Sequence, residues 1–310
     1  MTVCIAAICT HQGMNMIVGA SDRLVTYDDV EYEQPAPKIL PLASHTVALI
    51  AGSPEDHMTI VQRSFPRIGL LTLPTVEQIA NIYADEFANL RRLRAERRYL
   101  APLGLSIWTF LGNQTNLSLD VSSRLVDILE KECLESSAII AGSDQFGPHI
   151  YVVTDPGEAR CCDLDGWAAI GSGSRHADLQ FIEEKYHRAW EFENAFLTTY
   201  LAKKKADITP GVGPTTDLFW ITPGDQCRVL RPDEPIVVQV RNLHKRIEAN
   251  AKRAVKKARG SIRDWVKNEI SKNKPQGQQQ IETETAGGTE AIGDDTQGIS
   301  GGSAEGQPPT

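Results

Sequence analysis

The sequence predicts an α+β domain in which two mainly antiparallel β-sheets pack together between outer helices, a four-layer αββα arrangement. One observation is the order of the patterns, because strand-like segments alternate with groups of helical segments as far as about residue 240. A second observation is the run at residues 3–9, which is apolar throughout and is typical of a strand covered on both faces. Together they predict one domain over residues 1–240.

The expected strands follow from short apolar runs and the turns between them. Residues 3–9 and 16–20 are expected to form a hairpin, because the segment between them is polar and contains Gly13. Residues 46–51 form the next apolar run and end at Gly52. Further strands are expected at 138–141, 149–154, 159–162, 167–170, 217–221 and 226–230.

Two of the expected helices have clear N-terminal signals. Ser53 is a favourable N-cap, Pro54 suits the first helical position, and two acidic residues follow in the first turn. Thr75 and Gln78 have the spacing of a capping box. The remaining helices are expected from apolar periodicity at 107–111, 118–134, 176–190 and 193–205.

Charge divides the chain into three segments. Residues 1–240 carry 20 Lys and Arg against 31 Asp and Glu, residues 241–274 carry 12 against 3, and residues 275–310 carry none against 6. The last segment has few large apolar residues and cannot bury enough surface to offset its chain entropy, so a disordered acidic tail is predicted. The middle segment is predicted to be a basic amphipathic helix, with an apolar stripe of Leu243, Ile247, Ala251, Ala254, Ala258, Ile262 and Trp265.

The composition excludes several classes of protein. With 41% hydrophobic and 23% charged residues the chain is typical of a globular protein. No apolar stretch approaches the roughly 18 residues of a membrane span, and the apolar N-terminus lacks the basic leader of a signal peptide. The six cysteines show no metal-like pairs, and reduced thiols are expected. The sequence therefore predicts a cytoplasmic protein that does not bind membranes.

Thr2 is the first candidate for chemistry, because it directly follows Met1. Methionine aminopeptidase removes Met before small residues such as Thr, and the product carries a hydroxyl and a free α-amine on one residue. The ordinary pKa of that amine is about 7.7–8.0, so it can act as the general base for the hydroxyl. By itself, Thr2 is also consistent with an ordinary residue at the start of a strand.

Short motifs further along the chain change this interpretation. The motifs occur in order over residues 2–230, and their order and rough spacing resemble the proteasome β-subunit family of N-terminal nucleophile (Ntn) hydrolases, in particular bacterial ancestral β-subunits. They are Ala20-Ser21-Asp22-Arg23-Leu24-Val25-Thr26, Pro37-Lys38-Ile39, Leu49-Ile50-Ala51-Gly52, Ala141-Gly142-Ser143-Asp144 followed by Pro148-His149-Ile150-Tyr151, Ala169-Ile170-Gly171-Ser172-Gly173-Ser174, and Ala206-Asp207 with Val212-Gly213-Pro214-Thr215-Thr216-Asp217.

The resemblance implies a catalytic role for four residues. Thr2 is the nucleophile, and Lys38 lies beside it, where like-charge repulsion favours the uncharged α-amine. Asp22 orients Lys38 and balances its charge. The Gly52 N–H contributes to an oxyanion hole. The ordinary alternatives are a surface lysine, a turn carboxylate and a strand-to-helix turn.

The resemblance also implies supporting residues and shows departures from the family pattern. Ser172 and Asp207 are expected to support the Thr2 α-amine by hydrogen bonds, with helix capping as the alternative. Leu24 stands where the family often has Arg, and the neighbouring Arg23 would point to the other face of a strand. Residues 99–135 are interpreted as an insertion that could reshape the cleft or subunit contacts.

The function implied by the resemblance is a threonine-type peptidase that uses no metal or cofactor. Its expected substrate is peptide bonds in unfolded chains, and it is expected to assemble into a homo-oligomeric ring, with or without an ATPase partner. The alternatives are a small-molecule amidase, a catalytically idle structural ring subunit, and a nucleic-acid or protein-binding module acting through residues 241–274. The net charge of −11 on residues 1–240 opposes broad nucleic-acid binding.

Overall fold

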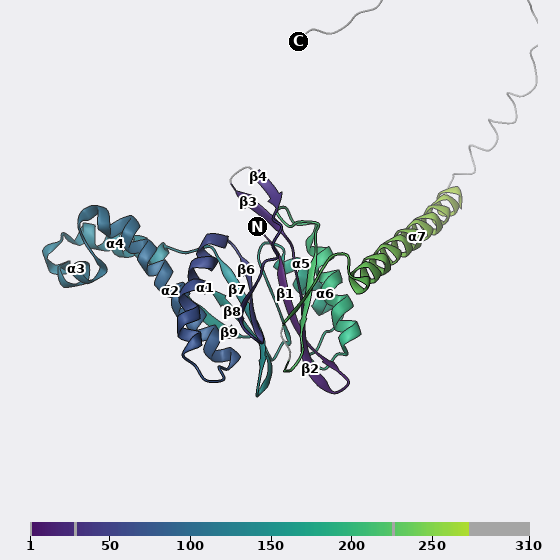
Figure 1. Ribbon diagram of the computed structural model, residues 1–310. Helices are drawn as coiled ribbons and strands as arrows, with labels where there is room; N and C mark the ends of the chain where they lie inside the picture. The colour runs from purple at the N-terminus through teal and green to yellow at the C-terminus, as the bar shows by residue number, and fades with distance from the viewer. Residues whose placement is uncertain (1, 28–29, 225–226, 273–310) are drawn as a thin grey trace, which may run out of the picture. The chain divides into compact units, whose positions relative to one another are not determined.

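The computed structural model describes residues 2–27, 30–224 and 227–272, and the chain divides into two units, Met1–Arg246 and Ile247–Thr310. The first unit has a mixed α+β fold with two five-stranded antiparallel sheets, ordered β10-β1-β2-β11-β12 and β5-β6-β7-β8-β9 (Figure 1). A separate hairpin pairs β3 with β4. The strands are β1 (Cys4–His11), β2 (Met14–Ser21), β3 (Leu24–Tyr27), β4 (Val30–Glu33), β5 (Ile39–Ala43), β6 (Thr46–Ala51), β7 (Ser137–Asp144), β8 (Gly147–Thr154), β9 (Glu158–Cys161), β10 (Trp167–Ile170), β11 (Asp217–Ile221) and β12 (Arg228–Leu230).

Except for α7, which follows the last strand, the helices lie between the strand groups along the chain. Helices α1 and α2 separate β6 from β7, and α5 and α6 separate β10 from β11. The helices are α1 (Pro54–Gly69), α2 (Val76–Ala95), α3 (Ile107–Gly112), α4 (Leu119–Lys131), α5 (Ser174–Glu183), α6 (Phe192–Ala206) and α7 (Pro235–Lys272), with short helical turns η1 (Glu96–Leu100), η2 (Ala101–Leu103) and η3 (Gln114–Asn116). Among the described residues, no helix is long and apolar enough to cross a membrane.

Strand β1 is buried on both faces, as its uninterrupted apolar run predicts. Ile5 and Ala7 belong to a core cluster shared with α5 and α6, which includes Phe181. Ala6 and Ile8 belong to a second cluster, which contains side chains of both sheets. Since successive side chains of a strand point to opposite faces, an apolar residue is required at every position. Burying one large aliphatic side chain in this way contributes about 1.5–3 kcal/mol.

A third core cluster joins the second sheet to α1 and α2, which lie on its outer side (Figure 1). Tyr83 and Phe87 of α2 are fully buried in this cluster. Both helices begin as predicted. The Ser53 hydroxyl accepts a hydrogen bond from the Asp56 N–H of α1, and Thr75 and Gln78 form both hydrogen bonds of a capping box at α2.

Residues 96–131, between α2 and β7, form short helical segments with a small core of their own. Leu100, Phe110 and Leu125 are buried together in it. Glu132, directly after these segments, is buried and accepts hydrogen bonds from Arg98 and Tyr99. These contacts fix the segment that leads back into β7.

Three strands lie outside the sequence prediction, and two helices end earlier than predicted, one of them the helix expected at 118–134, which ends at Lys131 in α4. Strands β3 and β4 form a hairpin between β2 and β5, and β5 is an edge strand of the second sheet. The predicted helix at 176–190 ends at Glu183 in α5, and Lys185 two residues later has a φ of +54°, a left-handed value that ends a helix.

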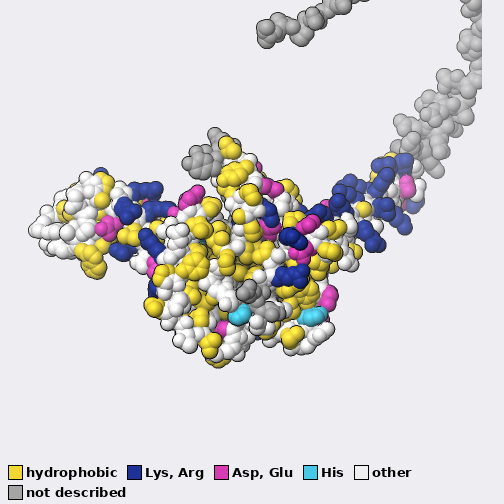
Figure 2. All heavy atoms as spheres, viewed as in Figure 1, with side chains coloured by type: hydrophobic (Ala, Val, Ile, Leu, Met, Phe, Trp, Pro, Cys, Tyr) yellow, Lys and Arg dark blue, Asp and Glu magenta, His cyan; other side chains and the backbone are white. Residues whose placement is uncertain are grey.

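Helix α7 begins at Pro235, before the predicted start at residue 241, and it continues through Gly260. Its first turns belong to the first unit, where Val237 and Val240 are buried in the cluster with α5 and α6. In the second unit, Lys and Arg side chains gather along the helix (Figure 2), and Ile262 and Trp265 of the predicted apolar stripe are exposed. The predicted tail at 275–310 lies outside the described residues.

Candidate active site

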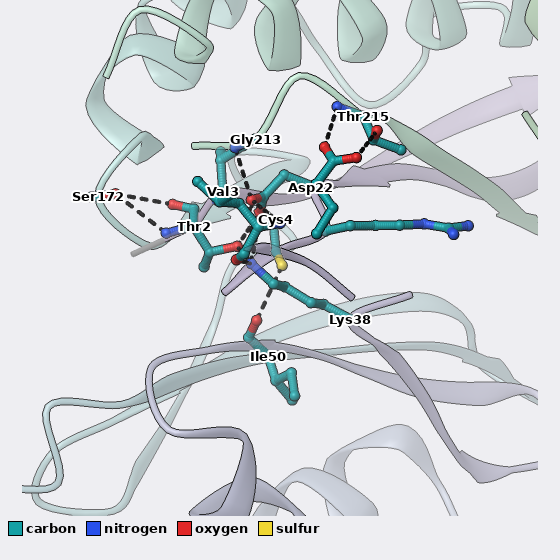
Figure 3. A network of polar contacts seen from close by, with 12 residues as sticks. Thr2, Val3, Cys4, Asp22, Lys38, Ile50, Ser172, Gly213 and Thr215 are labelled. Atoms are coloured by element: carbon teal, nitrogen blue, oxygen red, sulfur yellow. Dashed lines mark hydrogen bonds and ion pairs between the residues drawn. The ribbon is translucent and has the colours of Figure 1, made fainter. Parts of the chain in front are cut away.

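Thr2 lies two residues before the start of β1 and is almost fully buried, with 2% of its surface exposed. Its hydroxyl donates a hydrogen bond to the Asp22 carboxylate and accepts one from the Lys38 ammonium, with Nζ 2.5 Å from Oγ1 (Figure 3). The structure therefore brings together three of the residues that the sequence motifs single out. The Lys38 ammonium favours negative charge on this oxygen, and the hydrogen bond to Asp22 fixes the orientation of the hydroxyl.

The pairing of β1 with β2 places Asp22 beside Thr2. In this register Cys4 lies opposite Ser21, which brings Val3 opposite Asp22. The Asp22 N–H donates to the Val3 carbonyl at 3.2 Å, and the Val3 N–H donates to the Asp22 carboxylate at 3.0 Å. The Asp22 side chain is fully buried. Its oxygens also accept N–H groups from Leu24 at 3.0 Å and from Gly213 at 3.1 Å, so the buried carboxylate is well supplied with donors.

Lys38 lies immediately before β5, and the β5–β6 ladder fixes its backbone through the hydrogen bond from Ile50 N–H to its carbonyl. The ammonium lies 3.1 Å and 3.2 Å from the two oxygens of Asp22 and donates to the Leu24 carbonyl. With 5% of Lys38 exposed, this is a buried ion pair. Such a pair is tolerated only where further hydrogen bonds satisfy both charges, as they do here.

Ser172 holds the backbone of Thr2. The Thr2 nitrogen, which would be the α-amine after loss of Met1, donates to Ser172 Oγ at 3.3 Å, and the Ser172 hydroxyl donates to the Thr2 carbonyl at the same distance. Gly171 is required next to it, because its φ is +88° and a Cβ there would lie 2.3 Å from the Thr2 carbonyl oxygen. The loop 171–174 thus fixes both backbone groups of Thr2.

Asp207 is not brought to Thr2. It ends α6, and its carboxylate is bound by the ammonium groups of Lys203 at 2.7 Å and Lys204 at 2.8 Å, which lie one turn earlier. Asp207 is linked to the site only indirectly, through Lys203 and Gly213. Lys203 is fully buried and donates to the Gly213 carbonyl at 2.5 Å, while the Gly213 N–H donates to Asp22.

Arg23 takes a position that the strand pattern does not predict. Its guanidinium forms a bidentate ion pair with the buried carboxylate of Asp217, with nitrogen–oxygen distances of 2.6–3.0 Å, and also donates to the Pro35 carbonyl at 2.7 Å. The hydrogen bonds to Asp217 raise the pKa of Arg23 above its ordinary value. Arg23 therefore ties β11 to the segment that leads to Lys38.

A cleft of about 910 Å³ opens at this cluster, and Thr2, Lys38, Gly52 and Ser172 line it. One wall comes from the β3–β4 hairpin and the other from the segments after β6 and before β7. The remaining lining residues are Leu24, Val25, Thr26, Tyr32, Gln34, Ile50, Ala51, Ser53, Pro54, Glu55, Leu134, Glu135, Ser137 and Gly171.

Gly52 occupies a position that only glycine fits. Its φ is +109°, and a Cβ would lie 2.4 Å from Ser136 Oγ and 2.7 Å from Ser136 Cα. Ser136 Oγ itself accepts the Ser53 N–H, so it cannot move freely. The turn after β6 is therefore held against the segment before β7.

Gly52→Ala is expected to lower the free energy of unfolding more than Gly147→Ala does. Gly147 has a similar φ of +119° but nothing within 4 Å of an added Cβ, so it measures the backbone strain alone, about 1–3 kcal/mol. The overlap at Gly52 is expected to add at least about 1 kcal/mol. Urea denaturation of the two variants measures the difference, and equal losses would show that Ser136 yields without cost.

Among the described residues, no group of three His, Cys, Asp or Glu side chains is placed to hold a metal ion. Comparison of the chain with protein-family models and with curated proteins finds no match. The chemical interpretation of the cluster therefore depends on its geometry and on the resemblance of the motifs.

Proposed function

We propose that the chain is a threonine-type N-terminal nucleophile hydrolase that cleaves amide bonds with Thr2. The contact of the buried Thr2 hydroxyl with Lys38 and Asp22, at the wall of an open cleft, carries the proposal. An ordinary threonine at the start of a strand has no need of a buried ion pair. Such a pair costs desolvation energy, and replacement by apolar residues is often neutral or stabilising.

The fold supports the same class. Two antiparallel sheets share one core, and helices cover the outer face of each sheet. The four-layer Ntn-hydrolase arrangement orders its layers in this way. Within that class, the order of the motifs favours the proteasome β-subunit type.

The proposed reaction begins with attack of Thr2 Oγ on the carbonyl carbon of a peptide bond. The hydroxyl proton passes, through a water molecule, to the α-amine of Thr2. Negative charge develops on the carbonyl oxygen, where the Gly52 N–H would donate a hydrogen bond. The C–N bond then breaks, the leaving nitrogen takes the proton from the α-amine, and an ester to Thr2 remains.

Water hydrolyses that ester in the second half of the reaction. The α-amine takes a proton from the water, which attacks the ester carbon, and the proton returns to Thr2 Oγ as the acid product leaves. The ammonium of Lys38, 2.5 Å from Oγ1, stabilises negative charge on the nucleophile, and Asp22 balances the charge of Lys38. No step requires a metal or a cofactor.

A hairpin and two loop segments line the cleft, which is open rather than an enclosed pocket. Such a cleft favours an extended peptide as substrate. We propose peptide bonds in unfolded chains as the substrate, a homo-oligomeric ring as the working assembly and the cytoplasm as its location. An idle site is the competing outcome of the experiment that follows, and a small-molecule amide is the alternative substrate of the same nucleophile.

The proposal is tested by the mass of the N-terminus and by an epoxyketone probe, which reacts with a hydroxyl and an amine on the same residue. We expect Met1 to be absent and the probe to add once, to Thr2. The matched control is a variant with an uncleaved N-terminal extension, which keeps the hydroxyl but blocks the amine and should not react. Retained Met1 in the assembled protein, or a free Thr2 that never reacts, would contradict the proposal.

A further inference from the structure

His57 is a buried titratable side chain that the proposed mechanism does not use. It lies in the first turn of α1 with none of its surface exposed. Its Nε2 is 3.0 Å from the carbonyl oxygen of Ala51, and its Nδ1 is 2.7 Å from the hydroxyl of Tyr83 in α2. Both ring nitrogens therefore have partners.

These partners determine the proton positions. The Ala51 carbonyl can only accept, so Nε2 carries the hydrogen, and Nδ1 accepts the hydroxyl hydrogen of Tyr83. Burial lowers the pKa of His57 and raises the pKa of Tyr83, which agrees with a neutral imidazole and a protonated hydroxyl. The result is a fixed chain of donors from Tyr83 through His57 to the Ala51 carbonyl.

The Ala51 carbonyl belongs to the same peptide group as the Gly52 N–H. In a planar trans peptide the C=O and N–H point in opposite directions, so holding the carbonyl toward His57 turns the Gly52 N–H away from it. By the two-residue repeat of a strand, this N–H lies on the same side as the Ile50 N–H, which donates to the Lys38 carbonyl. The Lys38 backbone lies on that side, and Thr2, Lys38 and Gly52 all line the same cleft.

The β6–β7 ladder already restrains this peptide on its Ala51 side, since Ala51 pairs with Ser137 there. On the other side Gly52 has the wide backbone freedom of glycine and a φ of +109°, so the hydrogen bond from His57 is a second restraint on the direction of the Gly52 N–H. Ser136 restrains the next residue by accepting the Ser53 N–H.

We propose that His57, oriented by Tyr83, is a positioning residue that holds the Ala51–Gly52 peptide with its N–H directed at the carbonyl oxygen of the substrate. The inference rests on the proposed function, since it gives that N–H its task in the transition state. His57 touches no substrate and transfers no proton in this role. Its whole contribution is to pre-orient one donor.

Three variants of the full-length protein test this role. His57→Phe keeps a ring of similar size but removes both hydrogen bonds. His57→Gln keeps one donor and one acceptor, which are separated much as the two ring nitrogens are. Tyr83→Phe removes only the partner that orients the ring. For each variant, kcat and KM are measured on a fluorogenic peptide, together with thermal unfolding.

We expect His57→Phe to lower kcat about 10- to 100-fold with KM changed less than about twofold, because the lost donor acts mainly in the transition state. His57→Gln should recover most of kcat, and Tyr83→Phe should lie between. A folded His57→Phe variant with unchanged kcat overturns the proposal, and so does a Gln variant no better than the Phe variant. If His57→Phe does not fold, a Tyr83→Phe variant with the kcat of the wild type overturns it.

A crystal structure of His57→Phe separates this inference from the proposed function. If the wild-type protein does not hydrolyse peptides, the proposed function fails, and the orientation of the Ala51–Gly52 peptide still decides the positioning role. A turned or disordered peptide supports it. An Ala51 carbonyl in its original direction without His57 shows that the loop needs no anchor.

Discussion

Thr2→Ala is expected to fold as the wild type does and to lose peptide hydrolysis by roughly 10³-fold or more, because it removes the nucleophile. The loss of stability should be small, about 1–2 kcal/mol, since one buried hydroxyl and one buried methyl group are removed. The ion pair between Lys38 and Asp22, with oxygens at 3.1 Å and 3.2 Å, does not depend on that hydroxyl. The measurements are kcat/KM on a fluorogenic peptide and the urea-unfolding midpoint.

Thr2→Ser is the matched control, because it keeps both the hydroxyl and the α-amine. It should retain measurable hydrolysis and should still react with an epoxyketone. Near wild-type hydrolysis by Thr2→Ala, with the variant's mass verified, would remove the peptidase interpretation and leave the structural-subunit alternative.

Much of the fold could be predicted because its signals are local. The apolar run at β1 and the capping box of Thr75 and Gln78 are visible in a few residues each, and both correspond to observed elements. Strand β4 gives no such signal, because all four of its side chains are exposed and none marks a buried face. Strand β5 contains Pro41, which is tolerated there since the strand is at the edge of its sheet.

The site is harder to predict because its contacts connect distant parts of the chain. Thr2 lies 20 residues from Asp22 and 36 from Lys38, and they meet only through the β1–β2 register and the approach to β5. No local pattern encodes that meeting, so the resemblance of the motifs was the only sign of it. The Gly213 N–H could not be found at all, since a backbone donor leaves no mark in the sequence.

Asp207 is the opposite case. A local spacing predicts its contacts, but the resemblance of the motifs, which assigned it to Thr2, was given more weight. Lys203 and Lys204 precede Asp207 by four and three positions, the spacings at which side chains on a helix meet. That spacing predicts a carboxylate occupied at the end of its own helix. The structure has this arrangement. Lys203 connects Asp207 to Asp22 by way of Gly213, whose carbonyl it binds and whose N–H donates to Asp22.

Lys38→Ala is expected to lose hydrolysis to an extent comparable with Thr2→Ala, because both residues act on the same oxygen and such losses are not additive. Unlike Thr2→Ala, it should also destabilise the fold by about 3–5 kcal/mol. It leaves the fully buried Asp22 carboxylate without its cation, while the N–H donors of Leu24 and Gly213 compensate only in part. Urea denaturation and kcat/KM together measure the two effects, and a folded variant with wild-type kcat would contradict the proposed role.

The double variant Asp22→Asn with Lys38→Met separates the two effects of Lys38. It removes both charges and keeps side chains of similar size, so most of the stability lost in Lys38→Ala should return. Hydrolysis should not return, since nothing then stabilises negative charge on Thr2 Oγ1. If activity recovers together with stability, the lysine serves the fold alone. If stability recovers and activity does not, the positive charge 2.5 Å from the hydroxyl is needed for the chemistry.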